Sequence, residues 1–214
     1  MSRTYLRFPA APNLPLAPDE WGRQYQDQFA NVLRLYFNQL SGALQELARS
    51  GGGYQLSFPH GAAQRTTDLT FTANTATLVT LDQNDFLLGV KNPGNDGLIV
   101  EKSGIYNYQF SVQFANPDTQ IHTAYIWLRV NGVDLSGTGS KFDIPAKHGT
   151  SDGYLIAACN FYVELNGGDY VSLYAAVNNA AVYFEAYPAQ TSPFPMPAIP
   201  SVVATLSFVS APVA

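Results

Sequence analysis

The chain has 214 residues, and Asp, Glu, Lys and Arg make up 13% of them, about half the charged share of an ordinary soluble domain. Hydrophobic residues make up 46%, enough for a substantial core, so the composition excludes a disordered protein. The net charge of −5 provides no basic field for nucleic acid, and the sequence has no apolar run long enough to span a membrane. We therefore expect no nucleic-acid partner and no membrane insertion.

The first 17 residues predict an extended arm. Pro9, Pro12 and Pro15 alternate with apolar groups, and proline both fixes φ and removes a backbone hydrogen-bond donor. The opening MSRTYLRFP lacks the apolar run of a signal peptide, so we expect a protein made and kept in a cytoplasm. An extended segment with apolar side chains can dock on another protein. The candidate docking residues are Tyr5, Leu6, Phe8, Leu14 and Leu16.

Residues 18–50 predict one long helix. Pro18 suits a first helical turn, Asp19 and Glu20 complement the positive end of the helix dipole, and the glycines at 51–53 end it. Apolar residues recur at alternating spacings of four and three, the heptad pattern of a seam that faces another helix. The seam consists of Phe29, Leu33, Tyr36, Leu40, Ala43 and Leu47.

A second interpretation of this helix stays open. Val32, Leu35, Phe37 and Leu44 widen the apolar stripe beyond a strict seam, as in an amphipathic helix that packs on its own domain. The helix by itself does not determine how many copies would associate.

After a predicted Gly-rich linker at 51–67, residues 68–214 are expected to form a head domain built from strands. In residues 104–114, large apolar side chains alternate with polar ones, which predicts a half-buried antiparallel strand. Asn131 and Gly132 separate two such runs and favour a type I′ hairpin turn. A second hairpin is predicted to join residues 154–165 to 170–177 through Asn166 to Asp169.

Further strands are predicted near residues 68–72, 77–81, 86–90, 181–187 and 201–209. The segment 188–200 between the last two contains five prolines and predicts a long constrained loop. Eight or more short strands without intervening helices are typical of a two-sheet sandwich. The predicted fold is mainly β: a two-sheet antiparallel jelly roll preceded by an extended arm and one long helix.

Candidate catalytic groups are few. His60, His122 and His148 are far apart in the sequence and form no HExxH pattern, so we expect solvated loop histidines. Cys159 has no CxxC partner and lies in an apolar run, which favours a buried, inert thiol. We expect no enzyme activity, no catalytic residue, no metal site and no cofactor.

Two other residue types are candidates for ligand binding. Asp82, Asp85 and Asp96 lie in turn-like stretches that could hold Ca²⁺, but Asp is also a normal turn residue, and the turn role is favoured. Tyrosines on loops or strand edges could stack on sugar rings, but core packing is favoured because the alternation at 106–114 directs the aromatic side chains inward.

Four pieces of residues 68–210 resemble, in order, the globular head of complement and its relatives in the tumour-necrosis-factor-like superfamily. They are GIYNYQFSV, WLRVNGVDL, VELNGGDYVSLYA and VVATLSFV. The resemblance implies a three-fold trimer of heads, commonly at the end of a rod, so residues 18–50 would be the trimerisation stalk. The chain lacks the collagen repeats and secretory signal of that family, which argues against an extracellular animal role.

The N-terminal layout resembles structural proteins of marine and cyanobacterial phages, in which a short extended arm precedes a helix with Tyr-Phe-Asn-Gln-Leu, present here at 36–40. The resemblance implies a non-enzymatic virion protein: a homotrimeric fibre or capsid-decoration protein whose arm docks on capsid, portal or tail proteins. The alternative is a receptor- or carbohydrate-binding head that attaches the particle to host glycans.

Overall fold

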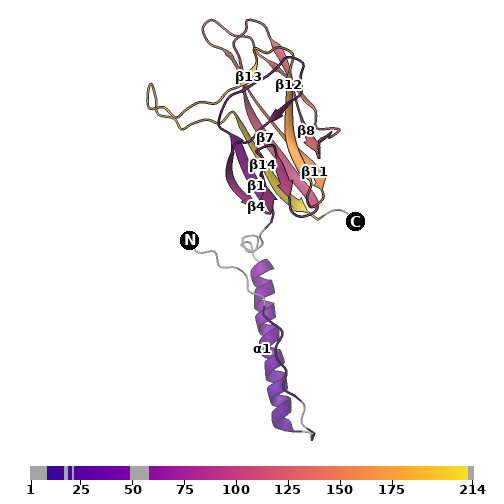
Figure 1. Ribbon diagram of the computed structural model, residues 1–214. Helices are drawn as coiled ribbons and strands as arrows, with labels where there is room; N and C mark the ends of the chain where they lie inside the picture. The colour runs from indigo at the N-terminus through magenta and orange to yellow at the C-terminus, as the bar shows by residue number, and fades with distance from the viewer. Residues whose placement is uncertain (1–8, 17–18, 21, 49–57, 212–214) are drawn as a thin grey trace. The chain divides into compact units, whose positions relative to one another are not determined.

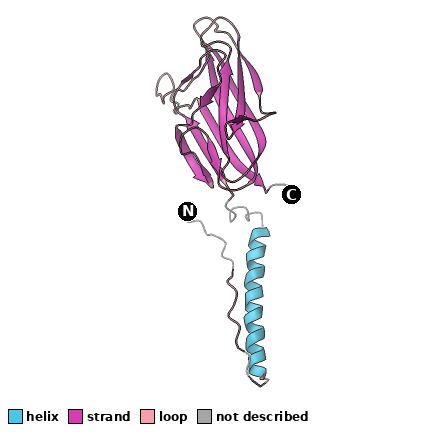
Figure 2. Cartoon of the chain, turned by 45° about the vertical axis from the view of Figure 1, so that its right-hand side comes forward, coloured by secondary structure: helices cyan, strands magenta, loops and turns pink. Residues whose placement is uncertain are grey.

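The computed structural model describes residues 9–16, 19–20, 22–48 and 58–211. The chain divides into two compact units, Met1–Ser57 and Phe58–Ala214. The N-terminal unit contains helix α1 (Arg23–Ala48), as predicted, but the helix begins at Arg23 instead of residue 18. Asp19 and Glu20 precede it, so their predicted place in the first helical turn is wrong. Residues 9–16 have no regular secondary structure and run beside α1 in both views (Figures 1 and 2).

The C-terminal unit is a sandwich of two antiparallel sheets, as Figure 2 shows. Sheet A has the order β2–β13–β7–β14–β1–β4, and β11 pairs with the other edge of β7. Its strands are β1 (His60–Arg65), β2 (Leu69–Thr70), β4 (Gln83–Leu88), β7 (Gly104–Asn116), β11 (Gly153–Leu165), β13 (Tyr183–Phe184) and β14 (Val202–Ser210).

Sheet B has the order β10–β8–β12–β6–β5, with β3 paired to β12 and β9 paired to β8. Its strands are β3 (Thr77–Val79), β5 (Val90–Lys91), β6 (Leu98–Val100), β8 (His122–Val130), β9 (Val133–Asp134), β10 (Ser140–Ile144) and β12 (Tyr170–Val177). The chain crosses between the sheets after β2, β3, β4, β6, β7, β10, β11 and β12, so that both sheets are built from strands distributed along the whole head. The predicted fold class is confirmed.

The core lies between the two sheets. Side chains alternate along β7 so that one set faces sheet B and is buried, because successive residues of a strand point to opposite faces. The predicted inward set on this strand is confirmed, with exposures of 3% or less: Tyr106, Tyr108, Phe110, Val112 and Phe114. Rings of Phe71, Phe114 and Phe184 meet edge to face, with centroids 4.9 Å apart for each of the two contacts.

The predicted hairpin at Asn131 and Gly132 is confirmed. These residues have φ of 51° and 81° and join β8 to β9, which pair antiparallel. The predicted long loop at 188–200 is also confirmed, since isolated bridges such as Gln190 with Met196 replace strand pairing there.

The second predicted hairpin is wrong. All 13 residues of β11 pair with β7 in sheet A, whereas β12 pairs with β8, β6 and β3 in sheet B. Residues Asn166 to Asp169 therefore form a corner between the sheets. At this corner, Gly168 N donates to the carbonyl oxygen of Val100 in β6 at 2.7 Å. A turn signal between two alternating strands does not specify whether the chain returns in the same sheet or crosses to the facing one.

The start of the head also differs from the prediction. Strand β1, HGAAQR, lies inside the segment predicted as a linker and pairs with β14 on one side and β4 on the other. Its residues have little intrinsic β propensity, so the two neighbouring strands determine its conformation. The glycines at 51–53 lie outside the described residues.

Candidate functional site

Strand β11 forms an unusual edge of sheet A. No strand of the described residues pairs with its second edge, although the strand is 13 residues long. Three of its outward side chains are exposed, by 53% for Tyr154, 64% for Ile156 and 67% for Tyr162; we call these three the edge patch. Natural edges are usually shortened, bulged or protected by Lys or Pro. Strand β11 has neither Lys nor Pro, and its one charged residue is Glu164.

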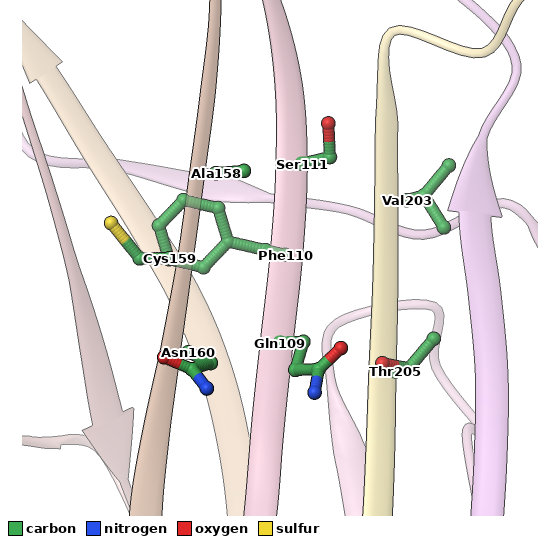
Figure 3. Close-up of a pocket in the computed structure, with 8 residues that line it drawn as sticks. All are labelled: Gln109, Phe110, Ser111, Ala158, Cys159, Asn160, Val203 and Thr205. Atoms are coloured by element: carbon green, nitrogen blue, oxygen red, sulfur yellow. The ribbon is translucent and has the colours of Figure 1, made fainter.

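A shallow hollow lies beside the edge patch, on the outer face of sheet A. Cross-strand pairing places Asn160, Gln109 and Thr205 in one row and Ala158, Ser111 and Val203 in the next. Figure 3 shows these side chains over β11, β7 and β14. The hollow has a volume of about 430 Å³, and no charged residue lines it; Phe110 and Cys159 complete its lining. Short side chains make the surface concave here.

Cys159 is less buried than the sequence suggested. The side chain is of intermediate exposure rather than sealed in the core, and its Sγ lies 3.6 Å from Ser140 Oγ. The alternation of β11 directs it toward sheet B, but its position on an edge strand leaves one side uncovered. Edge position therefore explains why the expected full burial is wrong.

The outer face of sheet B has a different chemistry. Trp127 of β8 and Tyr174 of β12 are register partners whose rings stack with centroids 6.1 Å apart. The guanidinium carbon of Arg129 lies 3.9 Å from the centroid of the Tyr174 ring. Asp134 joins them: its Oδ1 accepts from Trp127 Nε1 at 2.6 Å and from Arg129 Nε at 2.5 Å.

These bonds change the acidity of the charged pair. The hydrogen bond from Arg129, and then that from Trp127, lowers the pKa of Asp134. The same bond to Asp134 raises the pKa of Arg129. Both groups therefore stay charged at neutral pH. Together with exposed Tyr125, the side chains of Trp127, Arg129, Asp134 and Tyr174 form what we call the aromatic face.

The predicted seam residues of α1 are more covered than most of the helix, although Tyr25 and Val32 are covered to a similar degree. Ala43 is 8% exposed and the other five, Phe29, Leu33, Tyr36, Leu40 and Leu47, are half-buried. Leu35, Phe37 and Leu44 remain more than half exposed. The structure thus places the six seam residues on one stripe, and their role as a contact between copies stays a prediction.

The structure describes only part of the predicted docking arm. Leu14 is 46% exposed and Leu16 94% exposed. Tyr5, Leu6 and Phe8 lie outside the described residues.

The histidines do not come together. His122 is 8% exposed in β8, and its Nε2 lies 2.8 Å from Asp118 Oδ2, so the prediction of a solvated loop histidine is wrong for this residue. The bond from His122, and then that from Thr119 N, lowers the pKa of Asp118. His60 lies in β1, and His148 bridges Ser151.

Two of the three candidate Ca²⁺ aspartates bond to the segment at residues 64–66. Asp82 Oδ1 accepts from Thr66 N at 2.9 Å, and Asp85 Oδ1 accepts from Gln64 Nε2 at 2.7 Å. Asp82 lies just before β4, in keeping with the turn role, whereas Asp85 lies within β4 and bonds to β1, so the turn prediction is wrong for Asp85. No group of three or more His, Cys, Asp or Glu side chains among the described residues is placed to hold a metal ion. Asp96 belongs to no such group.

Sequence reasoning missed the hollow and the aromatic face. The alternation of β8 places residues 125, 127 and 129 on one face, and this signal was available. The identity of their neighbours on β12, β9 and β10 depends on strand register, which no local pattern contains.

Within the described residues, no helix has the length and apolar character that a membrane span requires. Comparison with protein-family models finds no match, and comparison with curated proteins finds none either.

Proposed function

We propose that this chain is a non-enzymatic structural subunit of a phage particle, assembled as a homotrimer in a fibre or a capsid decoration. The observation that carries the proposal is the unprotected edge of β11 beside the uncharged hollow of sheet A. Charged residues are depleted at the centre of protein interfaces, and long unpaired edges are normally covered. A second copy of the chain would cover both.

The size of this surface suits a stable interface. Thirteen residues of β11 at about 3.3 Å each span roughly 43 Å, and the three strands β11, β7 and β14 at about 4.8 Å cover roughly 14 Å. The product is on the order of 600 Å², at the lower end of what one partner contributes to a standard interface. An edge patch that packs on the hollow of the next copy is a head-to-tail contact, which forms a closed trimer when each copy is rotated by about 120° relative to the last.

Three-fold symmetry and the phage setting are supported by other features. The heptad spacing of α1 is typical of a helical bundle, and the head resembles a superfamily whose members trimerise. The arm followed by a helix with Tyr-Phe-Asn-Gln-Leu resembles phage structural proteins. The arm would then dock on capsid, portal or tail proteins.

The oligomeric state tests the proposal. Light scattering of the full chain is expected to give three times 23.3 kDa. Ile156→Asp places a charge in the proposed contact and should weaken the trimer. The variant trimer should dissociate at a protein concentration about tenfold higher, or more, than the unmodified protein. Ile121→Asp is the matched control, because Ile121 is 65% exposed but lies outside sheet A, and should change little. A single-chain mass for the unmodified protein would refute the trimer.

The arm is tested separately. Deletion of residues 1–17 should leave a trimer of normal stability that no longer enters phage particles, measured by its abundance in purified virions. Incorporation at the normal level would refute docking by the arm.

A second candidate function, attachment of the particle to its host, is favoured by the aromatic face on sheet B. This face combines one exposed aromatic side chain, Tyr125, and two half-buried ones, Trp127 and Tyr174, with hydrogen-bonding groups, the composition of many ligand sites. Binding of the purified trimer to host envelope fractions would test it, and absence of binding would leave the structural role alone.

A further inference from the structure

We propose that the outer face of sheet B binds a neutral sugar, with one face of a hexopyranose against Tyr125 and its hydroxyls on the neighbouring charged pairs. The inference rests on the second proposed function, attachment, and specifies its ligand and surface. It assigns a specific surface to the carbohydrate-binding alternative.

The first observation is that the ring of Tyr125 is accessible to a ligand. This side chain is 47% exposed, and no aromatic ring among the described residues stacks on it. Its register partner on β12 is Ala176, whose short side chain leaves space beside the ring, and its partner on β10 is Lys141. Tyrosine presents an apolar ring and a polar tip together. A pyranose has the complementary form, with C–H groups on one face and hydroxyls around the rim.

The second step is the row of polar groups along β8. Lys141 Nζ lies 3.6 Å from Asp143 Oδ1, and Arg129 Nε lies 2.5 Å from Asp134 Oδ1. Strands β10 and β9 both pair with β8. Lys141 of β10 is the register partner of Tyr125, and Asp134 of β9 is the register partner of Arg129, two residues after Trp127. Each pair offers a donor next to an acceptor, which is what neighbouring sugar hydroxyls require.

The third step is charge. The two pairs contribute two positive and two negative groups, so the face has no net charge of its own. An anionic sugar would meet Asp134 and Asp143, which are 61% and 59% exposed, as readily as the two cations. A neutral ligand avoids this repulsion, so we infer a neutral hexose rather than a sialylated, sulfated or uronic one.

The fourth step is rigidity and access. Asp134 is bonded by both Trp127 and Arg129, and Arg129 lies over Tyr174, so the face is held in place before any ligand binds. It lies on the opposite side of the sandwich from the hollow and the edge patch. Association of copies through sheet A would leave it exposed.

A glycan array probed with the full-length protein tests the inference. It should carry neutral hexose oligosaccharides beside sialylated, sulfated and uronic ones. Binding to neutral hexose glycans is expected, and Tyr125→Ala should weaken it by about tenfold. Tyr125→Phe keeps the ring and should stay within about threefold, and Phe194→Ala, which removes another exposed ring, should change nothing.

The outcomes separate the proposals. No neutral glycan bound, binding to anionic glycans alone, or full binding by Tyr125→Ala would each overturn the sugar site. Light scattering on the same samples reports the trimer independently. Binding to host envelope that protease removes but periodate does not would keep the attachment function while overturning the sugar.

Discussion

At the scale of single residues, Asn131 does more than provide a turn. Its Oδ1 accepts from Tyr170 N at 3.0 Å, and its Nδ2 donates to Asp169 Oδ1 at 2.8 Å. Asp169 Oδ2 in turn accepts from Asn166 N at 2.7 Å. The β8–β9 turn and the corner after β11 are therefore held together by one amide side chain.

Asn131→Ala should destabilise the head by about 1–2 kcal/mol, because it removes two hydrogen bonds and puts alanine at a positive φ. Denaturant unfolding would measure the loss. Asn131→Asp, which keeps the acceptor for Tyr170 N but faces the Asp169 carboxylate with a like charge, should also be destabilised at neutral pH. An unchanged midpoint for both variants would contradict this role.

Asp169 also predicts a pH dependence. Hydrogen bonds from the Asn131 side chain and then from Asn166 N lower its pKa. A lowered folded-state pKa gives stability that is present above the ordinary Asp value, about pH 4, and is lost as the pH falls through the folded-state pKa.

Asp169→Asn should therefore be less stable than the unmodified protein at about pH 7 but lose less stability between about pH 4 and pH 2. Unfolding midpoints measured across this range would show the two curves converge in acid. Parallel curves would mean that Asp169 does not contribute to acid sensitivity.

At the scale of elements, the start of β11 depends on a close backbone approach. A Cβ on Gly153 would overlap the carbonyl oxygen of Pro145, whereas a Cβ on Gly139 would meet no atom within 4 Å. The loop before β10 and the start of β11 thus differ in their tolerance of a methyl group. The register of β11 on β7, and with it the edge patch, begins at Gly153.

Gly153→Ala should cost about 2 kcal/mol or more, because Gly153 pairs with Asn116 of β7 and the Pro145 carbonyl accepts a hydrogen bond from the Asn116 side chain, so moving either backbone breaks an interaction. Gly139→Ala is the control and should change stability by less than about 1 kcal/mol. Thermal unfolding of the two variants would make the comparison. Equal effects would show that the approach at Gly153 can relax.

At the scale of the whole molecule, the core belongs to one unit. All members of the main hydrophobic cluster lie between Ala63 and Leu206, within the unit Phe58–Ala214. Residues 58–214 expressed alone should therefore unfold cooperatively at nearly the same temperature as the full chain at equal subunit concentration. A head that fails to fold without residues 1–57 would refute this division.

Several features were predictable from the sequence because their signals are local. The presence of one N-terminal helix, the inward set on β7, the turn at Asn131 and Gly132, and the sandwich class all follow from periodicity and turn residues. These patterns depend on the conformation of neighbouring residues and need no knowledge of distant strands.

The rest was decided by the tertiary structure. Whether β11 turns back or crosses to the other sheet, whether HGAAQR is linker or strand, and which side chains meet Trp127 all depend on strands far away in the sequence. The low charge content was visible in the composition alone. The fold places an uncharged hollow and an unprotected edge on sheet A, and an aromatic face on sheet B. Only the tertiary structure decides this, because strand pairing and register assign residues to surfaces.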